Sequence, residues 1–539
     1  MANISRQSIT ASRRMIFQKK IKPCVGILLA FFLHTVALAD SQSMFKALMS
    51  SVKKARQPPV VWTSASQLSP KVSFSIEHPE ALFSHNCANP AVSFVIPTTL
   101  NRDNYDDFII HYTCKQEVNG VYDDTQTKNS LAALISTSET TYQVANEEVF
   151  GSKLIGLGGA TRKYVARDIN TDGYEDYFFA TNSEDGRSSA DSKTLGAKLS
   201  GLMSDGLGKY NVIALGEKGW GHSVVMLAYE TGAIDIVHST YTNNSQAFRF
   251  QDGEFADVTD DYPQKQIAAW ANAVVAINEE ATTSYIVGTD FVNRGDFYDG
   301  LLRFHQVDSP GKLIEINYLE FNKAGVIDWV AWNGTPGKAA VIEYEGKLYI
   351  GGRFYGLCNM DWTHGTSGSV VVGNFNMQRR ADGVEIKVGD NIGDVQRANV
   401  NVLRFYAYDD AGMYEIPSPI INEVTDVNYN FYDCRDVNGD DLDDIVVYKL
   451  YRNAKPIVYL NDGNGSLVLE DVSSWPEHSS GSGPFKSLMH DINNDDVEDL
   501  LQFGMQVEDG RIEIHLMRRD GASSPSPQAS TSTISHGHK

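Results

Sequence analysis

The sequence is poor in basic residues, in cysteine and in long apolar runs, and each shortage narrows the range of possible functions. It has 46 lysines and arginines against 68 acidic residues, for a formal net charge of -22. Nucleic acid is therefore not an expected partner, because contacts with phosphate need clustered lysine and arginine. Beyond residue 39 no apolar run approaches the ~18 residues typical of a membrane-spanning helix, so we expect no transmembrane segment in the mature chain. The five cysteines include no C-x-x-C pair, which argues against a zinc site.

The N-terminal segment differs from the rest of the chain. Residues 1–22 carry six lysines and arginines and no acid, and the apolar run Val25–Leu38 then ends in Ala37-Leu38-Ala39. This order is typical of a secretory signal peptide cleaved after Ala39. A membrane anchor is the alternative, although the run is shorter than the ~20 residues that span a bilayer. We expect a secreted protein, located in the periplasm, outside the cell or on its surface.

The two ends of the mature chain are expected to lie outside the folded domain. Residues 40–59 are interpreted as a linker, and residues 521–539, rich in Ser, Thr and Pro, as a disordered tail. Four cysteines remain after export to an oxidising compartment, and they allow three disulfide connectivities. The preferred connectivity joins Cys87 to Cys114 and Cys358 to Cys434.

A short acidic motif recurs along the chain with the pattern D-x-N-x-D-x-x-x-D, followed by an apolar run. Full copies begin at Asp168, Asp436 and Asp491, and a weaker copy begins at Thr99. Short apolar or aromatic runs also precede the copies, so we expect each acidic segment to form a tight loop between two strands. Decayed copies are recognised near residues 227, 276 and 340. Asp-Gly pairs at 205, 252 and 462 indicate hairpin turns.

The repeats predict an all-β fold, a seven-bladed β-propeller over residues 60–520. The mean spacing is about 65 residues, longer than the ~40–50 residues of familiar blade repeats, and the long interval after residue 340 suggests an insertion around residues 358–397. The last copy leaves room for only two further strands. An N-terminal strand, either Val72–Ile76 or Val60–Thr63, is therefore expected to close the ring and remove its open sheet edge. We expect a monomer.

The chemistry of the acidic loops favours calcium. Ca²⁺ takes six to eight oxygen ligands, and a D-x-N-x-D loop presents side-chain oxygens at alternate positions of a tight turn. A helix-loop-helix calcium site needs glutamate at position twelve, where this chain has Phe179, Val447 and Gln502. The sequence therefore indicates strand-loop-strand sites. The alternative is that these are solvated acidic turns, since Asp and Asn favour turns on their own.

The motif resembles the FG-GAP/VCBS repeats of integrin α-subunit propellers and of many secreted bacterial proteins. The resemblance implies a seven-bladed propeller with three to four structural Ca²⁺ ions in hairpin loops. Position by position, the implied ligands are Asp168, Asn170, Asp172, Tyr174 (through its carbonyl) and Asp176; Asp436, Asn438, Asp440, Leu442 and Asp444; Asp491, Asn493, Asp495, Val497 and Asp499; and Asn101, Asp103 and Asp107 in the weaker copy. Thr99 replaces the first aspartate of that copy. Asp441 and Asp496 stand where the family usually has glycine, so we expect less comfortable left-handed residues there.

Function is less specified than fold. The chain has no G-x-S-x-G, H-E-x-x-H or P-loop motif. The leading interpretation is a secreted, calcium-stabilised binding or adhesion module for a protein or glycan, and a scaffold within a larger surface assembly is a further possibility. The alternative is a polysaccharide lyase, because some lyases are also propellers. In that interpretation His222, Tyr355 and His364 are candidate bases, with Arg353 neutralising a uronate. The simpler interpretation makes these four residues part of the packing.

Overall fold

A computed structural model provides the structure of the chain. It describes residues 68–76, 89–101, 103–115, 117–118, 121–122, 128–152, 155–157, 160–182, 196–219, 221–240, 245–263, 274–277, 284–289, 302–323, 329–331, 340–344, 347–351, 356–363, 366–379, 385–386, 400–409, 412–418, 422–424, 430–449, 455–477, 485–504 and 512–519. All of them belong to one compact unit, Gln57–Lys539. The expected signal peptide, linker and tail lie outside the described residues. No helix in the described part is long and apolar enough to cross a membrane.

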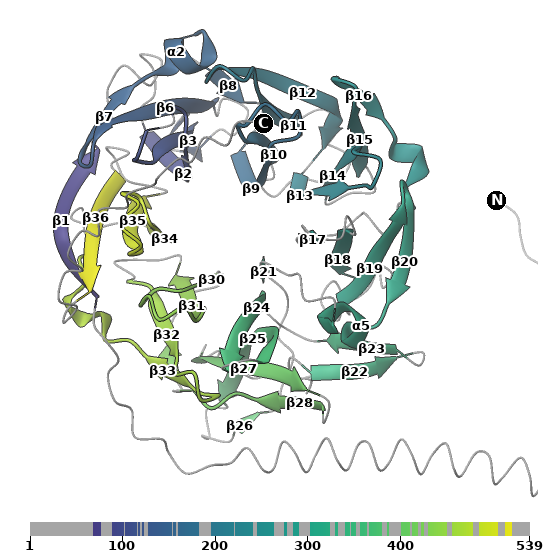
Figure 1. Cartoon of the computed structure of the whole chain (residues 1–539), viewed down its shortest axis with the longest axis vertical. Coiled ribbons are helices and arrows are strands. Elements are labelled where there is room, and N and C mark those ends of the chain that lie inside the picture. The colour runs from purple at the N-terminus through teal and green to yellow at the C-terminus, as the bar shows by residue number, and fades with distance from the viewer. Residues whose placement is uncertain are drawn as a thin grey trace, which may run out of the picture. The chain divides into compact units, whose positions relative to one another are not determined.

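The fold is an all-β propeller in which antiparallel sheets follow one another around a ring (Figure 1). Five sheets are regular. They contain β2 (Asn89–Thr98), β3 (Asp107–Lys115), β6 (Lys128–Ser138), β7 (Thr141–Val144) and β8 (Ile155–Leu157); β9 (Ala160–Arg167), β10 (Asp176–Asn182), β11 (Ala197–Ser204) and β12 (Tyr210–Gly219); β13 (Gly221–Ala228), β14 (Ile234–Thr240), β15 (Gln246–Gln251) and β16 (Glu254–Asp257); β30 (Asn430–Arg435), β31 (Asp444–Lys449), β32 (Ile457–Asn461) and β33 (Leu467–Leu469); and β34 (Phe485–His490), β35 (Asp499–Gly504) and β36 (Ile512–Arg519) with β1 (Leu68–Ile76).

Two further sheets are larger and less regular. One contains β17 (Val274–Ile277), β18 (Ser284–Thr289), β19 (Leu302–Ser309), β20 (Lys312–Ile316), β22 (Ala340–Tyr344) and β23 (Lys347–Gly351). The other contains β21 (Trp329–Ala331), β24 (Gly356–Thr363), β25 (Thr366–Arg379), β26 (Glu385–Ile386), β27 (Val400–Asp409), β28 (Gly412–Glu415) and β29 (Asn422–Val424). Among the described residues the remaining elements are the hairpin β4 (Glu117–Val118) and β5 (Val121–Tyr122), the helices α2 (Asn146–Phe150) and α5 (Tyr318–Lys323), and two 3-10 turns, Thr259–Asp261 and Val472–Ser474.

The number of blades differs from the prediction. The propeller has six blades instead of the seven predicted, although the described residues form seven sheets of four or more strands. Six of the seven predicted repeats do coincide with a loop between the first two strands of a sheet. The predicted repeat near residue 340 is instead the hairpin β22–β23, which pairs with β19 and enlarges the preceding sheet. Residues 356–379, predicted to lie in an insertion, form β24 and β25 at the centre of the seven-stranded sheet. That prediction was wrong because the enlarged sheets lack the acidic loop that marks the regular blades.

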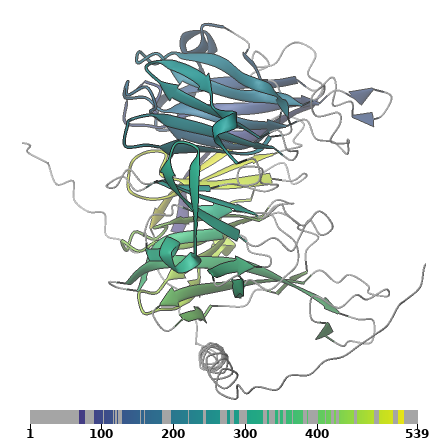
Figure 2. The same cartoon turned by 90° about the vertical axis from the view of Figure 1, so that its right-hand side faces the viewer.

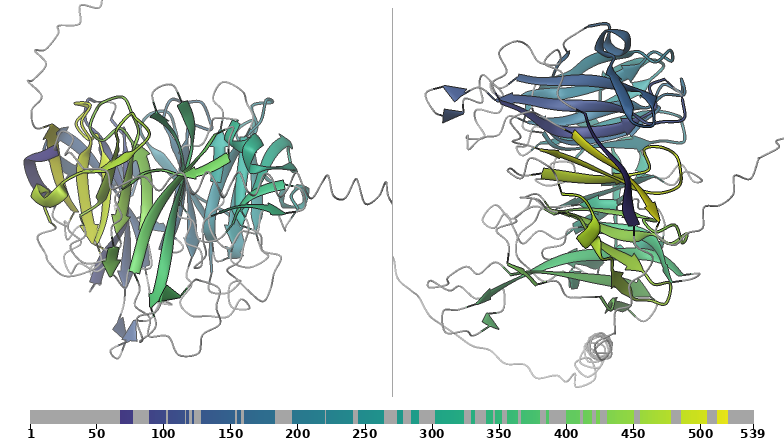
Figure 3. Two further views of the ribbon diagram at one scale, coloured as in Figure 1. Left: turned by 90° about the horizontal axis from the view of Figure 1, so that it is seen from below. Right: turned by 90° about the vertical axis from the view of Figure 1, so that its left-hand side faces the viewer.

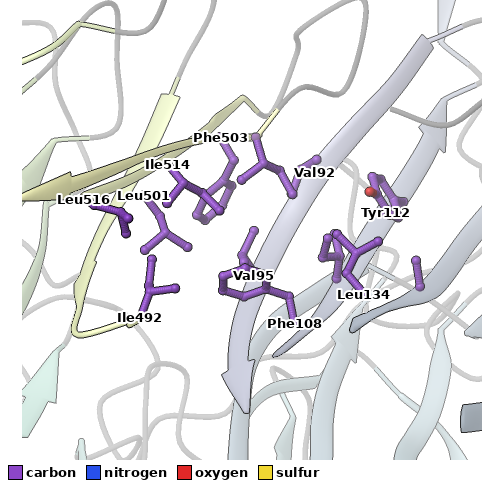
Figure 4. Close-up of a cluster of buried hydrophobic side chains, with 13 residues drawn as sticks. Val92, Val95, Phe108, Tyr112, Leu134, Ile492, Leu501, Phe503, Ile514 and Leu516 are labelled. Carbon is purple, nitrogen blue, oxygen red and sulfur yellow. The ribbon is translucent and has the colours of Figure 1, made fainter. Parts of the chain in front are cut away.

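The hydrophobic core lies between neighbouring sheets, because each blade is buried on both faces. The second strand of each regular blade is mostly apolar, and its apolar residues alternate between two clusters: Phe108 and Ile110 face the last sheet, whereas Ile109 faces the next one. Figure 4 shows the cluster in which Val92, Val95 and Phe108 pack against Ile492 and Leu501 from the other end of the chain. Side views show the same stacking of sheet on sheet around the ring (Figures 2 and 3).

Several local predictions are confirmed. The Asp252-Gly253 turn between β15 and β16 has positive φ at both residues (54° and 85°), as an Asp-Gly hairpin requires. The ring is closed by an N-terminal strand. This strand, β1, includes Val72–Ile76 and pairs antiparallel with β36, from Leu68↔Arg519 to Ile76↔Ile512 (Figure 3, right). Cys434 is disulfide-bonded, and the other cysteine side chains lie outside the described part.

The start of the closing strand is held by two side chains of the neighbouring blade. The Leu68 N–H donates to Glu470 Oε1 at 3.2 Å, and Trp475 Nε1 donates to the Leu68 carbonyl at 3.0 Å. Glu470 is only 2% exposed, and its Oε2 has no partner among the described residues. Burial raises the pKa of Glu470 to about 7. The folded protein therefore keeps a proton here that the unfolded chain loses above its ordinary pKa.

Replacing Glu470 with glutamine should stabilise the protein at pH 8 and leave it nearly unchanged at pH 5. A raised folded-state pKa gives stability that is complete below the unfolded pKa and is lost as the pH rises through about 7. The neutral amide of E470Q removes this loss, which we expect to be on the order of 1–2 kcal/mol at pH 8. Denaturant unfolding of both proteins between pH 5 and pH 8 measures it. A stability difference that does not change with pH would contradict the assignment.

Candidate metal centres

Four acidic loops occupy equivalent places in four blades. Each joins the first strand of a sheet to the second: loop 1 (residues 99–107) lies between β2 and β3, loop 2 (168–176) between β9 and β10, loop 3 (436–444) between β30 and β31, and loop 4 (491–499) between β34 and β35. Because the loops make the same connection in each antiparallel sheet, they emerge at the same end of their blades. The nine positions of each loop are numbered here from its first residue.

The aspartate at position nine is buried and clamps each loop to its own sheet. Its side chain accepts two backbone N–H groups, one from position two of the loop and one from the third strand of the blade. For Asp176 the donors are Ile169 at 2.9 Å and Ser204 at 2.7 Å. The equivalent aspartates and donors are Asp107 with Leu100 and Ser136, Asp444 with Val437 and Asn461, and Asp499 with Ile492 and Met517. All four aspartates are 0% exposed.

The other polar positions fold the loop around their own side-chain oxygens. In loop 2, the backbone N–H groups of Asp172 and Gly173 donate to Asp168, at 3.0 and 2.8 Å. The Asn170 amide donates to Asp172 Oδ2 at 2.9 Å, and the Tyr174 N–H donates to Asp172 Oδ1 at 2.9 Å. Loops 3 and 4 repeat these contacts around Asp436 and Asp440 and around Asp491 and Asp495. The side chains of positions one, three and five therefore hold the backbone of each of these loops.

The predicted left-handed residues at position six are confirmed. Asp441 and Asp496 have φ of 65° and 61° where loop 2 has Gly173 at 87°. Position four is also left-handed in loops 2, 3 and 4, at Thr171, Gly439 and Asn494. A non-glycine residue in this region costs energy and persists only where the surroundings hold it. The shared backbone strain shows that these loops have one common conformation.

Loop 1 departs from the others where its sequence does. Thr99 supplies no carboxylate at position one, and Asp103 at position five accepts a side-chain hydrogen bond from Ser136 Oγ at 3.2–3.3 Å in addition to the local contacts. The Asn101 amide still donates to Asp103 Oδ2 at 2.7 Å, and Asp107 keeps its two backbone donors. Loop 1 therefore keeps the contacts of positions three, five and nine and has one carboxylate fewer.

Burial and neighbouring carboxylates raise the pKa of the position-nine aspartates. Burial, assisted by Asp172, raises the pKa of Asp176 to about 6. Burial, assisted by Asp495 and Asp491, raises the pKa of Asp499 to about 8. Burial raises the pKa of Asp444 well above its ordinary value and also raises that of Asp107. The backbone donors only partly offset this, and a cation bound nearby would favour the ionised form of each aspartate.

Two of the decayed copies have a different group at position nine, and neither has the acidic motif. In the copy near residue 227, Asp235 at position nine is also 0% exposed. Arg249 donates to it from Nε at 2.7 Å and from Nη2 at 2.9 Å, and the hydroxyls of Tyr229 and Tyr262 donate at 2.9 and 2.5 Å. In the copy near residue 276, position nine is the neutral Ser284, whose hydroxyl bonds the backbone of Ala228. Each decayed copy thus has a compensated or uncharged group there.

The atoms that the loops could offer to a cation are mostly oxygens. Within the described residues, no group of three or more His, Cys, Asp or Glu side chains is placed so that it could hold a metal ion. The loops mix carboxylate, amide and backbone oxygens, which is the donor set that Ca²⁺ takes. In loop 4 the Asn493 amide nitrogen donates to Asp495 and Glu139, which orients its Oδ1 away from them. That Oδ1 is buried and has no hydrogen-bond partner among the described residues, so the loop offers an acceptor suited to a cation.

Contacts between neighbouring loops were not predicted from the sequence. The residue before loop 3, Arg435, donates to Glu498 at position eight of loop 4 (2.8 Å). His490, before loop 4, contacts Asp106 at position eight of loop 1 (2.5 Å). Thr98, before loop 1, is linked through the Tyr177 hydroxyl to Glu175 at position eight of loop 2. The signal in the sequence was the recurrence of a polar residue before each loop and an acid at position eight.

The candidate catalytic residues are not brought together in the described part. His222 lies in β13, but its side chain is not among those described. Arg353, Tyr355 and His364 lie outside the described residues. The described residues therefore give no active-site arrangement that would support the lyase interpretation.

Comparison with known proteins identifies no family. No family model matches the chain, and no curated protein matches it. Solved structures do match at low similarity. The N-terminal domain of BBS1 in complex with ARL6 is 11% identical, covering 86% of this chain and 99% of that one, with a TM-score of 0.36. The exotype rhamnogalacturonan lyase YesX is 11% identical, covering 79% and 72%, with a TM-score of 0.38. A structure of S. cerevisiae Dbp5 with Nup159 and Gle1 is 9% identical, covering 85% and 97%, with a TM-score of 0.36. At these values the similarities assign no function.

Replacing Arg249 with methionine should strongly destabilise the protein. The substitution leaves the Asp235 carboxylate buried without its cation, which typically costs about 3–5 kcal/mol. K312M is the matched control, because Lys312 and Asp308 form an exposed pair at 2.5 Å whose loss should cost at most about 1 kcal/mol. Denaturant unfolding measures both. Adding D235N to R249M should recover part of the loss, and equal stability of R249M and K312M would contradict the role given to Arg249.

Proposed function

We propose that this protein is an exported, calcium-stabilised β-propeller of the FG-GAP/VCBS type that acts as a binding module for a protein or glycan. Calcium is the part of this proposal that the geometry supports most directly. The binding role rests on the fold, which presents loops from every blade around one ring, and on the pattern of the N-terminal segment for export.

The observation that carries the calcium proposal is the contrast at position nine. Where the blade lacks the acidic motif, the buried group is either compensated by an arginine, as at Asp235, or neutral, as at Ser284. In loops 2 and 4, which have the full motif, the buried aspartate has backbone N–H donors and other carboxylates beside it. A divalent cation at the motif supplies the missing positive charge.

The residues that would hold the cation are those of positions one, three, five, seven and nine in loops 2, 3 and 4. Bound Ca²⁺ would supply positive charge and Lewis acidity for its oxygen ligands, and in this role it is structural. The chain itself preorganises the loop, because backbone N–H groups already hold the position-one and position-five carboxylates in place. Loop 1, with Thr99 at position one, would bind most weakly.

Removing calcium should lower the melting temperature by several degrees. A ligand that binds only the folded state adds about 4 kcal/mol when it is present at a thousand times its dissociation constant. Unfolding in calcium, in excess chelator and in chelator with calcium restored measures the effect. D252N is a suitable control variant, since Asp252 is an exposed turn aspartate outside the loops and should respond to calcium like the wild type. A melting temperature that is the same in all three conditions would sink the calcium proposal.

The binding role predicts retention of a partner without turnover. The mature protein in calcium should bind defined members of a glycan array or one purified surface protein, and the binding should weaken in chelator as the loops loosen. The same polysaccharides are then assayed for unsaturated uronate products by ultraviolet absorbance. Catalytic formation of such products would replace the binding module with the lyase alternative.

A further inference from the structure

Loop 4 lies at the seam of the ring, which we define as the contact between the last sheet (β34–β36 with β1) and the first sheet (β2, β3, β6, β7 and β8). Three contacts cross the seam from this loop to loop 1. His490 contacts Asp106 at 2.5 Å, the Asp106 N–H donates to the Ile492 carbonyl at 3.0 Å, and the Asn494 amide donates to the Asn104 carbonyl at 2.8 Å. The two loops therefore fix each other across the join.

Loop 4 also holds the strand to which the closing strand is paired. The buried Asp499 accepts the Met517 N–H of β36 at 2.7 Å, and Arg519 of β36 donates to the Asp496 carbonyl at 2.6 Å. These two residues of β36 lie opposite the first residues of the closing strand, in the pairs Pro70↔Met517 and Leu68↔Arg519. A change in the shape of loop 4 thus acts on the part of β36 where β1 begins.

A side-chain relay connects loop 4 directly to the closing strand. Glu139, at the end of β6 in the first sheet, accepts from the Asn493 amide at 3.2 Å and from Lys71 Nζ at 3.0 Å through the same oxygen, Oε1. Asn493 is position three of loop 4, and Lys71 belongs to β1. The relay joins the loop, the first sheet and the closing strand at one carboxylate.

The equivalent amide in loop 2 stays within its own sheet. Asn170 donates to the Ser204 carbonyl of β11 at 2.9 Å, and Asp176 clamps β11 as well. Asn493 and Asn170 occupy the same position of the same motif, but their side-chain amides donate to different sheets. Asn170 thus holds its own blade, whereas Asn493 reaches across the seam to Glu139.

We propose that cation binding at loop 4 controls the closure of the ring, so that loss of the cation from this loop releases the N-terminal strand β1 while the other blades stay folded. The proposal rests on the calcium role proposed above. Without the cation, loop 4 lacks the positive charge that would hold the oxygens of Asp491, Asp495 and Asp499 together. The loop then loosens its hold on β36 and on Glu139 together, and β1 is the element that depends on both.

The test compares equivalent substitutions in two loops. D495N and D172N each remove one position-five carboxylate, and calcium binding to each purified variant is counted by titration calorimetry. Hydrogen exchange of the intact protein in calcium is then measured by mass spectrometry for peptides covering 68–76 and 160–182. We expect D495N to speed exchange of 68–76 at least tenfold. D172N should leave that peptide within about twofold of the wild type and speed exchange of 160–182 instead.

A second variant keeps the proposal testable if D495N fails to fold. E139A removes the acceptor that Lys71 and Asn493 share and replaces no proposed ligand, so it should leave the number of bound calcium ions unchanged and still speed exchange of 68–76. If calcium binds and both D495N and E139A leave 68–76 as protected as in the wild type, the closure proposal is overturned while the calcium sites stand. If the wild type binds no calcium, the titration overturns both proposals at once.

Discussion

The structure depends on a buried carboxylate that must be compensated. Every blade that carries the acidic motif places an aspartate at 0% exposure where two strands and a loop meet, and uses it to fix both backbones. Such a clamp is strong because each oxygen accepts a backbone N–H, and it is costly because the charge is desolvated. The chain meets that cost with Arg249 in one blade and avoids it with Ser284 in another. In the four blades that carry the motif, the proposed cation would supply the compensating charge.

This constraint connects the local loops to the ring. The apolar strands alternate their side chains between two neighbours, so each blade is stable only with a blade on either side. The polar contacts at the loop end follow the same order, from Arg435 to Glu498 and from His490 to Asp106. The apolar core and the polar loop contacts therefore stabilise the same order of sheets around the ring. The seam is the one place where this order is not supplied by adjacent sequence, and it carries the additional contacts of β1, Glu139 and Arg519.

Much of this could be predicted because it is local. The loops, the Asp-Gly turns and the left-handed Asp441 and Asp496 follow from a few neighbouring residues, and the closing strand follows from a blade that lacks one strand. The hairpin at 340–351 and the strands β24 and β25 were misplaced, because their sheets carry no such motif. The Asp235–Arg249 pair and the contacts between loops could not be predicted, since they depend on which residues of separate strands or blades face each other.

A crystal structure of the mature protein grown in calcium tests the central claim most directly, with the ion identified by its anomalous scattering. The account predicts a bound ion in each of loops 2, 3 and 4, with ligand distances of about 2.3–2.6 Å to oxygens of positions one, three, five, seven and nine, and a weaker ion or none in loop 1. It predicts no ion beside Asp235, where Arg249 already supplies the charge. Water alone in loops 2, 3 and 4 at saturating calcium would contradict it.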